Sequence, residues 1–277
     1  MRPLISCLMV TQPGRETLIR RAIACFERQT YERRELVVVH DAPNATGDGR
    51  DSLARFLRTE AESARIVSAE PGRSLGELRN RAIEQAGGDL VCQWDDDDQY
   101  HPDRLARQWE AMQEAKADAC FLASQLHYFA GSRELFVRDV GTRGIEGTVM
   151  HRRDLPVRYP AMAKEEDTVF MRELVKRFNT TVLHGEPWLY LRVFHGNNTW
   201  DEQHHRRMMQ SAWDVETLRA WQDELTRQTR SYDLLRPVTV RGRDGRAFGI
   251  PPRDGPPSCG DATLSARPVL TRWKVES

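Results

Sequence analysis

Short apolar runs alternate with longer amphipathic segments through the first half of the chain, and this alternation constrains the fold more than any other feature. Runs rich in valine, leucine and isoleucine predict strands at 4–10, 35–40, 64–69 and 90–94. The intervening segments carry apolar residues at helical spacing and predict helices at 15–29, 51–62, 74–86 and 102–112. Continuously apolar strands separated by helices are typical of a mainly parallel sheet covered on both faces, so we expect an α/β fold.

Local signals mark the ends of two of these helices. Ser74 and Glu77 have the spacing of a capping box, which predicts that the third helix begins there. Gly87 and Gly88 follow it and predict its end. Pro102 suits the first turn of the fourth helix, because a proline at that position loses no intrahelical hydrogen bond.

The second half of the chain is less regular. The segments 119–129 and 134–140 predict a β-hairpin that turns near Gly131 and Ser132. Further elements are expected as a helix at 166–178, strands at 180–185 and 187–193, and a long polar helix at 201–230. Beyond Leu235 the chain holds six prolines and five glycines with little periodicity, which predicts a loosely ordered tail. We therefore divide the chain into 1–200, a helical extension at 201–235 and a tail at 236–277.

Charge and cysteine content exclude several classes of protein. The 277 residues include 41 lysines and arginines and 41 aspartates and glutamates, so a basic nucleic-acid-binding surface is not indicated. The five cysteines are odd in number, widely spaced and without a CxxC pair, which argues against a disulfide framework or a zinc site. The N-terminal apolar run is too short for a signal peptide, and no apolar segment reaches the length of a membrane span. We expect a soluble, cytoplasmic protein.

The fourth predicted strand ends in four consecutive aspartates, within GGDLVCQWDDDDQYHP at 87–102. So much negative charge beside a buried strand is unfavourable without a positive partner. In parallel sheets, ligands bind beyond the carboxyl ends of the strands, where Thr11 and Asp41 are also expected. Carboxylate oxygens suit Mg²⁺ or Mn²⁺, whose open positions substrate phosphates fill. The run therefore predicts a metal that bridges the protein to a phosphorylated ligand. The alternative is a solvated acidic loop in which Asp98 caps the next helix.

Three segments of roughly the first two hundred residues resemble the family 2 glycosyltransferases, which are inverting enzymes with the GT-A fold. Residues 4–48 are similar to the family's opening, in which a strand, a helix ending in Gln-Thr-Tyr and a second strand ending in aspartate build the nucleotide pocket. Residues 77–105 resemble the central segment, with an Arg-Asn helix, a Gly-Asp turn and a DxD motif. EEDTVFMREL at 165–174 resembles the segment that supplies the catalytic base. The resemblance implies a GT-A catalytic domain over 1–200, with a nucleotide-sugar half at 1–101 and an acceptor half at 102–200.

The same resemblance implies roles for residues on the donor side. Asp41 would hydrogen-bond the base of the nucleotide, Thr11 would line the same pocket through its backbone, and Arg79 would lie near the nucleotide or its phosphates. Asp95–Asp97 aligns with the DxD motif, so Asp97 would bind the metal with Asp95, and Asp95 or Asp96 would reach the ribose or a metal-bound water. The alternatives are that Asp41 and Thr11 are ordinary strand-end residues and that Arg79 is a surface arginine.

On the acceptor side, the resemblance implies that Asp167 is the general base, with Glu166 as its substitute or as a contact to the donor sugar. Both could instead be first-turn acids that complement a helix dipole. His195 would be a third metal ligand near the pyrophosphate, or else a structural histidine. Three aromatic residues are expected in the core, with stacking on an acceptor sugar as the alternative: Trp188, Tyr190 and Trp200. His204 and His205 are expected at the surface.

Together these residues imply a glycosyltransferase that depends on Mn²⁺ or Mg²⁺. It would move a hexosyl or N-acetylhexosaminyl unit from a nucleoside-diphosphate sugar, a UDP-sugar by preference, to a hydroxyl of a glycan or glycolipid during polysaccharide biosynthesis. One alternative is a nucleotidyltransferase, although TQPGRETL is a poor match to the phosphate loop of such enzymes. Another is a non-catalytic protein that binds a nucleotide sugar or glycan on the same fold. The sequence leaves the oligomeric state and a peripheral contact with a membrane open.

Overall fold

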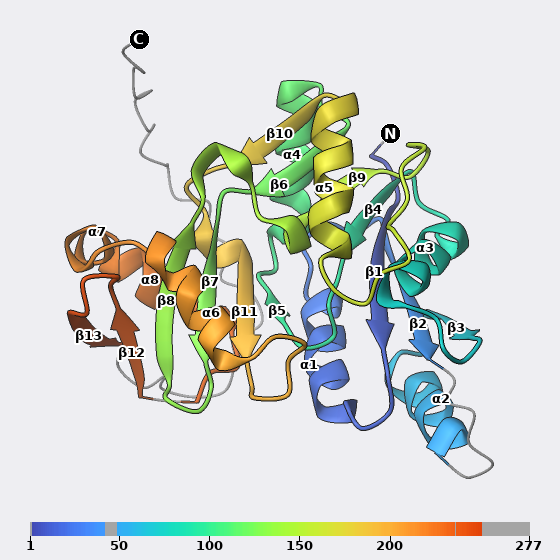
Figure 1. Cartoon of the computed structure of the whole chain (residues 1–277), viewed down its shortest axis with the longest axis horizontal. Helices are drawn as coiled ribbons and strands as arrows, with labels where there is room; N and C mark the ends of the chain where they lie inside the picture. The colour runs from blue at the N-terminus through green and yellow to red at the C-terminus, as the bar shows by residue number, and fades with distance from the viewer. Residues whose placement is uncertain (1, 42–48, 236, 251–277) are drawn as a thin grey trace.

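The computed structural model describes residues 2–41, 49–235 and 237–250, which form two sheets with helices packed around them (Figure 1). The larger sheet has seven strands in the order β10-β6-β9-β4-β1-β2-β3. All neighbouring pairs in it are parallel except those that involve β9. The strands are β1 (Ile5–Thr11), β2 (Arg34–Asp41), β3 (Arg65–Ala69), β4 (Leu90–Gln93), β6 (Ala119–Leu122), β9 (Met150–Arg152) and β10 (Thr180–Leu183). The predicted α/β fold with a mainly parallel sheet is confirmed.

Helices cover both faces of this sheet because side chains along its central strands alternate between two apolar cores. Cys7 and Met9 of β1 pack in one core with Ile19 of α1, whereas Leu8 between them packs in the other core with Leu78 of α3. The helices of the larger sheet are α1 (Glu16–Glu27), α2 (Gly49–Glu60), α3 (Leu75–Gln85), α4 (Arg104–Ala115) and α5 (Glu166–Arg177). The alternation that the sequence shows is therefore the alternation of two buried layers.

The start of α3 is fixed by two features. Ser74 and Glu77 form the predicted capping box: the Ser74 hydroxyl accepts a hydrogen bond from the Glu77 N–H, and the Glu77 carboxylate accepts one from the Ser74 N–H. Gly76 follows in the first turn, where an added Cβ would lie 1.9 Å from the backbone oxygen of Pro160. Because Gly76 has no side chain, the segment before α5 can cross directly over the first turn of α3.

The smaller sheet has six strands in the order β13-β12-β8-β7-β11-β5. Its strands are β5 (Gln99–Tyr100), β7 (Ser124–Phe129), β8 (Glu134–Asp139), β11 (Tyr190–Phe194), β12 (Val238–Arg241) and β13 (Ala247–Ile250). The predicted hairpin is confirmed for the antiparallel pair β7–β8, but it is wrong for 119–122, which form β6 of the larger sheet. The prediction of a loosely ordered tail is wrong for β12 and β13, because β12 pairs with β8 and buries Val238 and Val240. Residues 251–277 lie outside the described residues.

The predicted long helix over 201–230 is wrong. The chain forms three short helices there, α6 (Glu202–Met208), α7 (Val215–Ala220) and α8 (Gln222–Gln228), with 3-10 turns at Met209–Ser211 and Thr229–Ser231. Asp201 and Asp214 each begin a new helix, because their carboxylates accept hydrogen bonds from the N–H groups of His204 and Thr217 at 2.8 and 2.9 Å. Further 3-10 turns lie at Gly141–Arg143 (η1), Glu146–Thr148 (η2) and Pro187–Leu189 (η3). None of the described helices is long and apolar enough to cross a membrane.

Three buried histidines predict that the fold weakens in mild acid. Burial lowers the pKa of His151 to about 4 and that of His205 to about 3, and it also lowers the pKa of His127. Below about pH 6.5 these histidines become protonated in the unfolded chain but stay neutral in the folded chain. The free energy of unfolding therefore falls as the pH falls. For His151 the loss is on the order of 2 kcal/mol at pH 5.

This loss can be measured by thermal melting at pH 7.5 and pH 5 of the wild-type protein and of His151→Gln. The variant should lose less stability between the two pH values, because a glutamine takes up no proton. His184→Gln, at an exposed position, serves as the control and should behave as the wild type does. Equal losses in the wild type and His151→Gln would contradict the assignment of a neutral His151.

Candidate active site

The four aspartates lie in the loop between β4 and β5, beyond the carboxyl ends of β4 and β1. They do not share one environment: Asp96 and Asp98 are buried, with 2% of their surface exposed, whereas Asp95 and Asp97 are half-buried. The loop thus buries two of its carboxylates and leaves the other two partly exposed.

Asp96 and Asp97 share one arginine. The Arg15 guanidinium contacts Asp96 Oδ1 at 2.5 Å and Asp97 Oδ2 at 3.0 Å, and the Thr11 hydroxyl donates to Asp96 Oδ2 at 2.6 Å. Burial and the charge of Asp97 raise the pKa of Asp96 to about 7, against the opposing effect of Arg15. The pKa of Asp97 is instead lowered, because its hydrogen bond to His195 and the charge of Arg15 outweigh its burial. Asp97 is thus the ionised carboxylate of this pair.

Asp98 does not cap the following helix, so that expectation is wrong. Its carboxylate accepts hydrogen bonds from the Tyr190 hydroxyl at 2.5 Å and from the Val193 N–H at 2.8 Å. It therefore ties the aspartate loop to β11 of the smaller sheet. Pro102 is also outside the helix, since α4 begins at Arg104 with Asp103 as its N-cap. The loop needs these extra residues because β5 pairs with β11 before the helix can begin.

Arg79 joins the aspartate loop to the segment that carries the predicted base. Its guanidinium lies 3.0 Å from Asp95 Oδ1 and, through Nε, 3.0 Å from Glu166 Oε1. Only 8% of Arg79 is exposed, so the alternative of a surface arginine is wrong. Gln93 adds hydrogen bonds to both carboxylate oxygens of Asp95 at 3.2 and 3.1 Å. The Arg79 guanidinium therefore holds both Asp95 and Glu166 in place.

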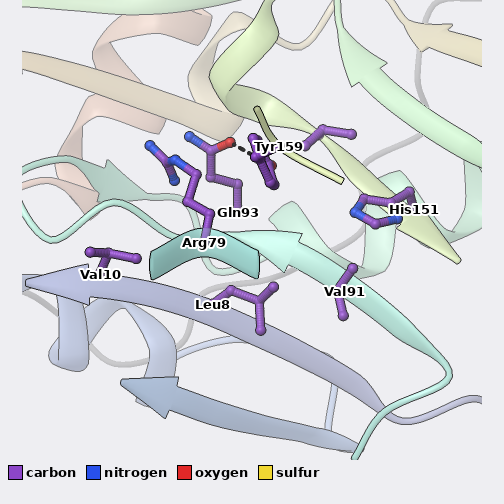
Figure 2. Close-up of a pocket in the computed structure, with 8 residues that line it drawn as sticks. Leu8, Val10, Arg79, Val91, Gln93, His151 and Tyr159 are labelled. Carbon is purple, nitrogen blue, oxygen red and sulfur yellow. Dashed lines mark hydrogen bonds between the residues drawn. The ribbon is translucent and has the colours of Figure 1, made fainter. Parts of the chain in front are cut away.

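A small cavity lies under Arg79 between the sheet and the segment before α5 (Figure 2). Its volume of about 10 Å³ is room for one water molecule. Arg79, Gln93 and Tyr159 converge on one side of it, and the Arg79 guanidinium lies 5.8 Å from the centre of the Tyr159 ring. The Tyr159 ring is in turn stacked on Phe170 of α5 at 4.0 Å. This packing restricts the positions that the Arg79 side chain can adopt.

Asp167 and Glu166 occupy the first turn of α5, which faces the aspartate loop. Glu166 is buried and paired with Arg79, whereas Asp167 is half-buried and its carboxylate accepts only the N–H of Thr168 among the described hydrogen bonds. Burial raises the pKa of Asp167, and the charges of Arg79 and Arg192 act in the opposite sense. Glu165, which precedes the helix, has a left-handed backbone with φ of 63°. A strained non-glycine residue at this point sets the direction in which α5 starts.

His195 lies beside Asp97, as a metal-ligand pair requires. Its Nε2 is 3.4 Å from Asp97 Oδ2, and Asn198 Nδ2 is 3.5 Å from the same oxygen. Asn198 also accepts a hydrogen bond from the His195 N–H at 2.9 Å, which holds the loop after β11 in place. Asp95, the other predicted ligand, is instead directed at Arg79 and Gln93. The structure thus brings two of the three predicted ligands together.

The donor set at Asp97 and His195 is suitable for Mn²⁺ or Mg²⁺. It consists of an ionised carboxylate oxygen and an imidazole nitrogen that face each other and are both partly exposed. The described part of the chain contains no ready-made group of three or more histidine, cysteine, aspartate or glutamate side chains around one point. These two side chains therefore fit a metal ion whose remaining ligands come from a bound phosphate and water.

The two strand-end residues lie at the same edge of the sheet as the aspartate loop. Thr11 ends β1 and Asp41 ends β2, and the two strands pair in parallel up to Thr11 and His40. The side chain of Asp41 is not among the described ones. Thr11 has a partner that its expected backbone role did not foresee, since its hydroxyl is bonded to Asp96.

Sequence analysis did not foresee Arg15, which binds Asp96 and Asp97, the bond from Tyr190 to Asp98, or the charge of Arg192 near the loop. It assigned the positive partner of the aspartates to a metal, whereas Arg15 and Arg79 are hydrogen-bonded to them directly. Arg192 lies close enough to Asp98 and Asp95 for their charges to raise its pKa. A charged residue inside the apolar run PWLYLRVF was the signal that could have identified it. Its expectation for His205 was also wrong, since His205 is fully buried and its Nδ1 lies 3.0 Å from His127 Nε2.

The chain is similar to several carbohydrate-active proteins. TuaG of Bacillus subtilis (strain 168), which bears the name of a teichuronic acid biosynthesis glycosyltransferase, is 27% identical over 125 residues, covering 45% of this chain and 48% of TuaG. WcaA of Escherichia coli (strain K12), named for colanic acid biosynthesis, is 33% identical over 106 residues, covering 38% of this chain and 36% of WcaA. The matched region thus spans about half or less of the length of these curated relatives.

Solved structures share the fold. The S. aureus TarS 1–349 structure in complex with UDP superposes with a TM-score of 0.53 at 17% identity, covering 84% of this chain and 76% of TarS 1–349. The mannosyltransferase PcManGT from Pyrobaculum calidifontis, in complex with GDP-Man and Mn²⁺, gives 0.51 at 16% identity, covering 85% of this chain and 66% of PcManGT. The predicted GT-A-type fold is thereby confirmed.

The family model described as "Glycosyl transferase family 2" matches residues 7–196. This range includes the end of β1, the aspartate loop, the first turn of α5 and His195, and it covers more than half of the chain. The resemblance that the three sequence segments carry is therefore confirmed. The chain belongs to glycosyl transferase family 2.

Proposed function

We propose that the protein is a metal-dependent, inverting glycosyltransferase. It moves a hexosyl or N-acetylhexosaminyl unit from a nucleoside-diphosphate sugar, a UDP-sugar by preference, to a hydroxyl of a glycan or glycolipid. The observation that carries this proposal is Arg79, whose two ion pairs of 3.0 Å hold Asp95 of the aspartate loop next to Glu166 and thus to the first turn of α5. One cation connects the residues assigned to the donor with the segment assigned to the acceptor.

The donor is placed at the carboxyl ends of β1, β2 and β4, the edge at which ligands bind in parallel sheets. Asp41 is assigned to the nucleotide base, Thr11 to the pocket wall, and Asp95 or Asp96 to the ribose. Asp96 is buried beneath Arg15 and Thr11, so Asp95 is the better placed of the two. The buried thiols of Cys7, Cys25, Cys92 and Cys120 are unpaired, which favours a cytoplasmic location where nucleotide sugars are available.

Asp167 is assigned as the general base that accepts the proton of the attacking hydroxyl. Its raised pKa, caused by burial, makes its carboxylate a better proton acceptor than that of an ordinary aspartate. Glu166, held by Arg79, cannot easily turn toward an acceptor and acts as a contact to the donor sugar or to the cation. A single displacement with one base and no covalent intermediate inverts the anomeric configuration.

Asp97 and His195 are the residues that would hold the metal. A bound Mn²⁺ or Mg²⁺ supplies positive charge to the diphosphate leaving group. Arg15 shares Asp97 and keeps that carboxylate ionised, so the site retains a charged ligand before any metal arrives. Two solved relatives support the choice of donors to test, since TarS was solved with UDP-GlcNAc and PcManGT with GDP-Man and Mn²⁺.

Thermal melting with UDP and with GDP, each in Mn²⁺ and in EDTA, tests the donor site. The correct nucleotide at about a hundred times its dissociation constant adds about 2.7 kcal/mol to the stability of the protein, which is a rise of roughly 5–10 °C. We expect this rise with UDP and Mn²⁺, and a smaller one in EDTA. If neither nucleotide shifts the melting temperature in either solution, the donor assignment is wrong.

A further inference from the structure

One face of the smaller sheet carries polar side chains at positions where buried sheet residues are normally apolar. Gln125 and His127 lie on β7, and their cross-strand partners include Arg138 of β8, opposite Gln125, and Arg192 of β11, opposite His127. Cross-strand partners project to the same face of a sheet, so these four side chains form one patch. We call these four residues the β7 polar patch.

Buried atoms of the β7 polar patch lack hydrogen-bond partners. Gln125 is fully buried, yet neither its amide nitrogen nor its amide oxygen is bonded. Arg138 is 6% exposed and its Nε is buried without a partner. Buried polar groups are normally satisfied, and each such group costs about 1–3 kcal/mol when it is not. Several unsatisfied groups in one place indicate that a bound ligand supplies their hydrogen-bond partners.

The two arginines of the patch also lack direct counter-ions. Arg15, Arg79 and Arg206 each make short ion pairs, but the described residues offer Arg138 and Arg192 no carboxylate within 4 Å. Burial and the charges of Arg192 and Arg143 lower the pKa of Arg138 to about 10, although the charge of Glu146 opposes this. The charge of Arg138 is therefore not paired with any described carboxylate, whereas Arg192 experiences the charges of Asp98 and Asp95 without a direct ion pair.

The β7 polar patch is continuous with the acceptor side of the site. Arg192 lies two residues from Tyr190 on β11, so both side chains project to one face of the sheet, and the Tyr190 hydroxyl is bonded to Asp98 of the aspartate loop. β8, which carries Arg138, leads through η1 into η2, and η2 packs against α5 and places Gly147 beside Asp95 and the Tyr190 hydroxyl. The diphosphate is assigned to the other side of the loop, at Asp97 and His195. An anion at Arg138 would thus belong to the acceptor, whose attacking hydroxyl gives its proton to Asp167.

We propose that Arg138 and Arg192, with the Gln125 amide, bind an anionic group of the acceptor, a phosphate or a carboxylate next to the reacting hydroxyl. This rests on the proposed function, because it takes Asp167 as the base. Arginine forks match such groups with paired hydrogen bonds, and the unbonded Gln125 nitrogen supplies a further donor. The acceptor of this enzyme is therefore an acidic glycan or a phosphate-containing polymer or lipid, in preference to a neutral one.

Calorimetric titration of the full chain tests this, with UDP and Mn²⁺ present so that the donor site is filled. The probes are glycerol 3-phosphate and glucuronate, compared with glycerol and glucose as their neutral counterparts. At least tenfold tighter binding of one anionic probe is expected, and the identity of that probe tells a phosphate from a carboxylate. Arg138→Gln should lower the affinity at least tenfold, whereas Arg207→Gln, an exposed arginine on α6, should leave it unchanged.

The outcomes separate this inference from the proposed function. Equal binding of charged and neutral probes, or loss of affinity in Arg207→Gln as large as in Arg138→Gln, overturns the anionic subsite. A parallel titration without UDP completes the test: anions that bind in the absence of UDP and not in its presence occupy the donor site, which overturns the subsite too. If Arg138→Gln fails to fold, Arg192→Gln takes its place with the same expectation. A protein that binds the anions but no nucleotide overturns the proposed function and leaves the arginine site standing.

Discussion

Replacing Asp167 by asparagine should lower the rate of sugar transfer by a factor of roughly 10² to 10⁴ while leaving the affinity for the donor nearly unchanged. This is the usual contribution of a positioned general base, and the asparagine has the same shape but accepts no proton. Asp167 bonds only to the neighbouring Thr168 N–H in the described structure, so its replacement disturbs no other element. Donor turnover and the UDP-induced rise in melting temperature are the two measurements.

Glu165→Gln is the matched control for this variant. It removes one negative charge two residues away, from an exposed side chain, and its turnover should remain within about threefold of the wild type. Unchanged turnover in Asp167→Asn would remove this residue from the mechanism. A protein that still binds the donor but never turns it over, in the wild type as well, would instead favour the non-catalytic alternative.

Replacing Asp97 by alanine should abolish the metal-dependent part of nucleotide binding. Asp97 is the ionised carboxylate that faces His195, so its loss leaves a single imidazole to hold the ion. The melting temperature in Mn²⁺ and UDP should then equal that in EDTA and UDP, and transfer should fall by at least 10². Melting curves with both nucleotides and a transfer assay provide the readout.

Asp154→Ala is the control for Asp97→Ala, since Asp154 is exposed and, among the described residues, its ion pair is with Arg152 at the surface. It should keep the full response to Mn²⁺. A response of Asp97→Ala equal to that of the wild type would place the metal elsewhere. A response lost in His195→Ala but kept in Asp97→Ala would assign the ion to the histidine loop alone.

Short-range patterns allowed much of the larger sheet to be predicted. The strands and helices of the first half follow from apolar periodicity, and the start of α3 follows from a capping box four residues long. The three short helices after Asp201 were missed because Asp214, a second N-cap inside a polar segment, looks like any other exposed acid. β12 was missed because it gains its stability from pairing with β8, about a hundred residues earlier in the chain.

The candidate site shows the same division. Asp95–Asp97, Asp167 and His195 could be chosen from motifs, because each lies in a short recognisable segment. Arg15 could not, since its partners Asp96 and Asp97 are 81 and 82 residues away in the chain. The orphaned groups of Gln125 and Arg138 are also invisible in the sequence, because only the strand register places them opposite each other.

The bridge that Arg79 forms between Asp95 and Glu166 makes the two halves of the site thermodynamically linked. Under the proposed assignment, a donor that draws Asp95 to its ribose would change how much of the Arg79 charge is left for Glu166 and for the adjacent Asp167. If donor binding changes the proton affinity of the base by a given factor, protonation of the base changes the affinity for the donor by the same factor. If the proposed site assignments hold, the acceptor side of the protein responds to a bound donor through the charge of this one side chain.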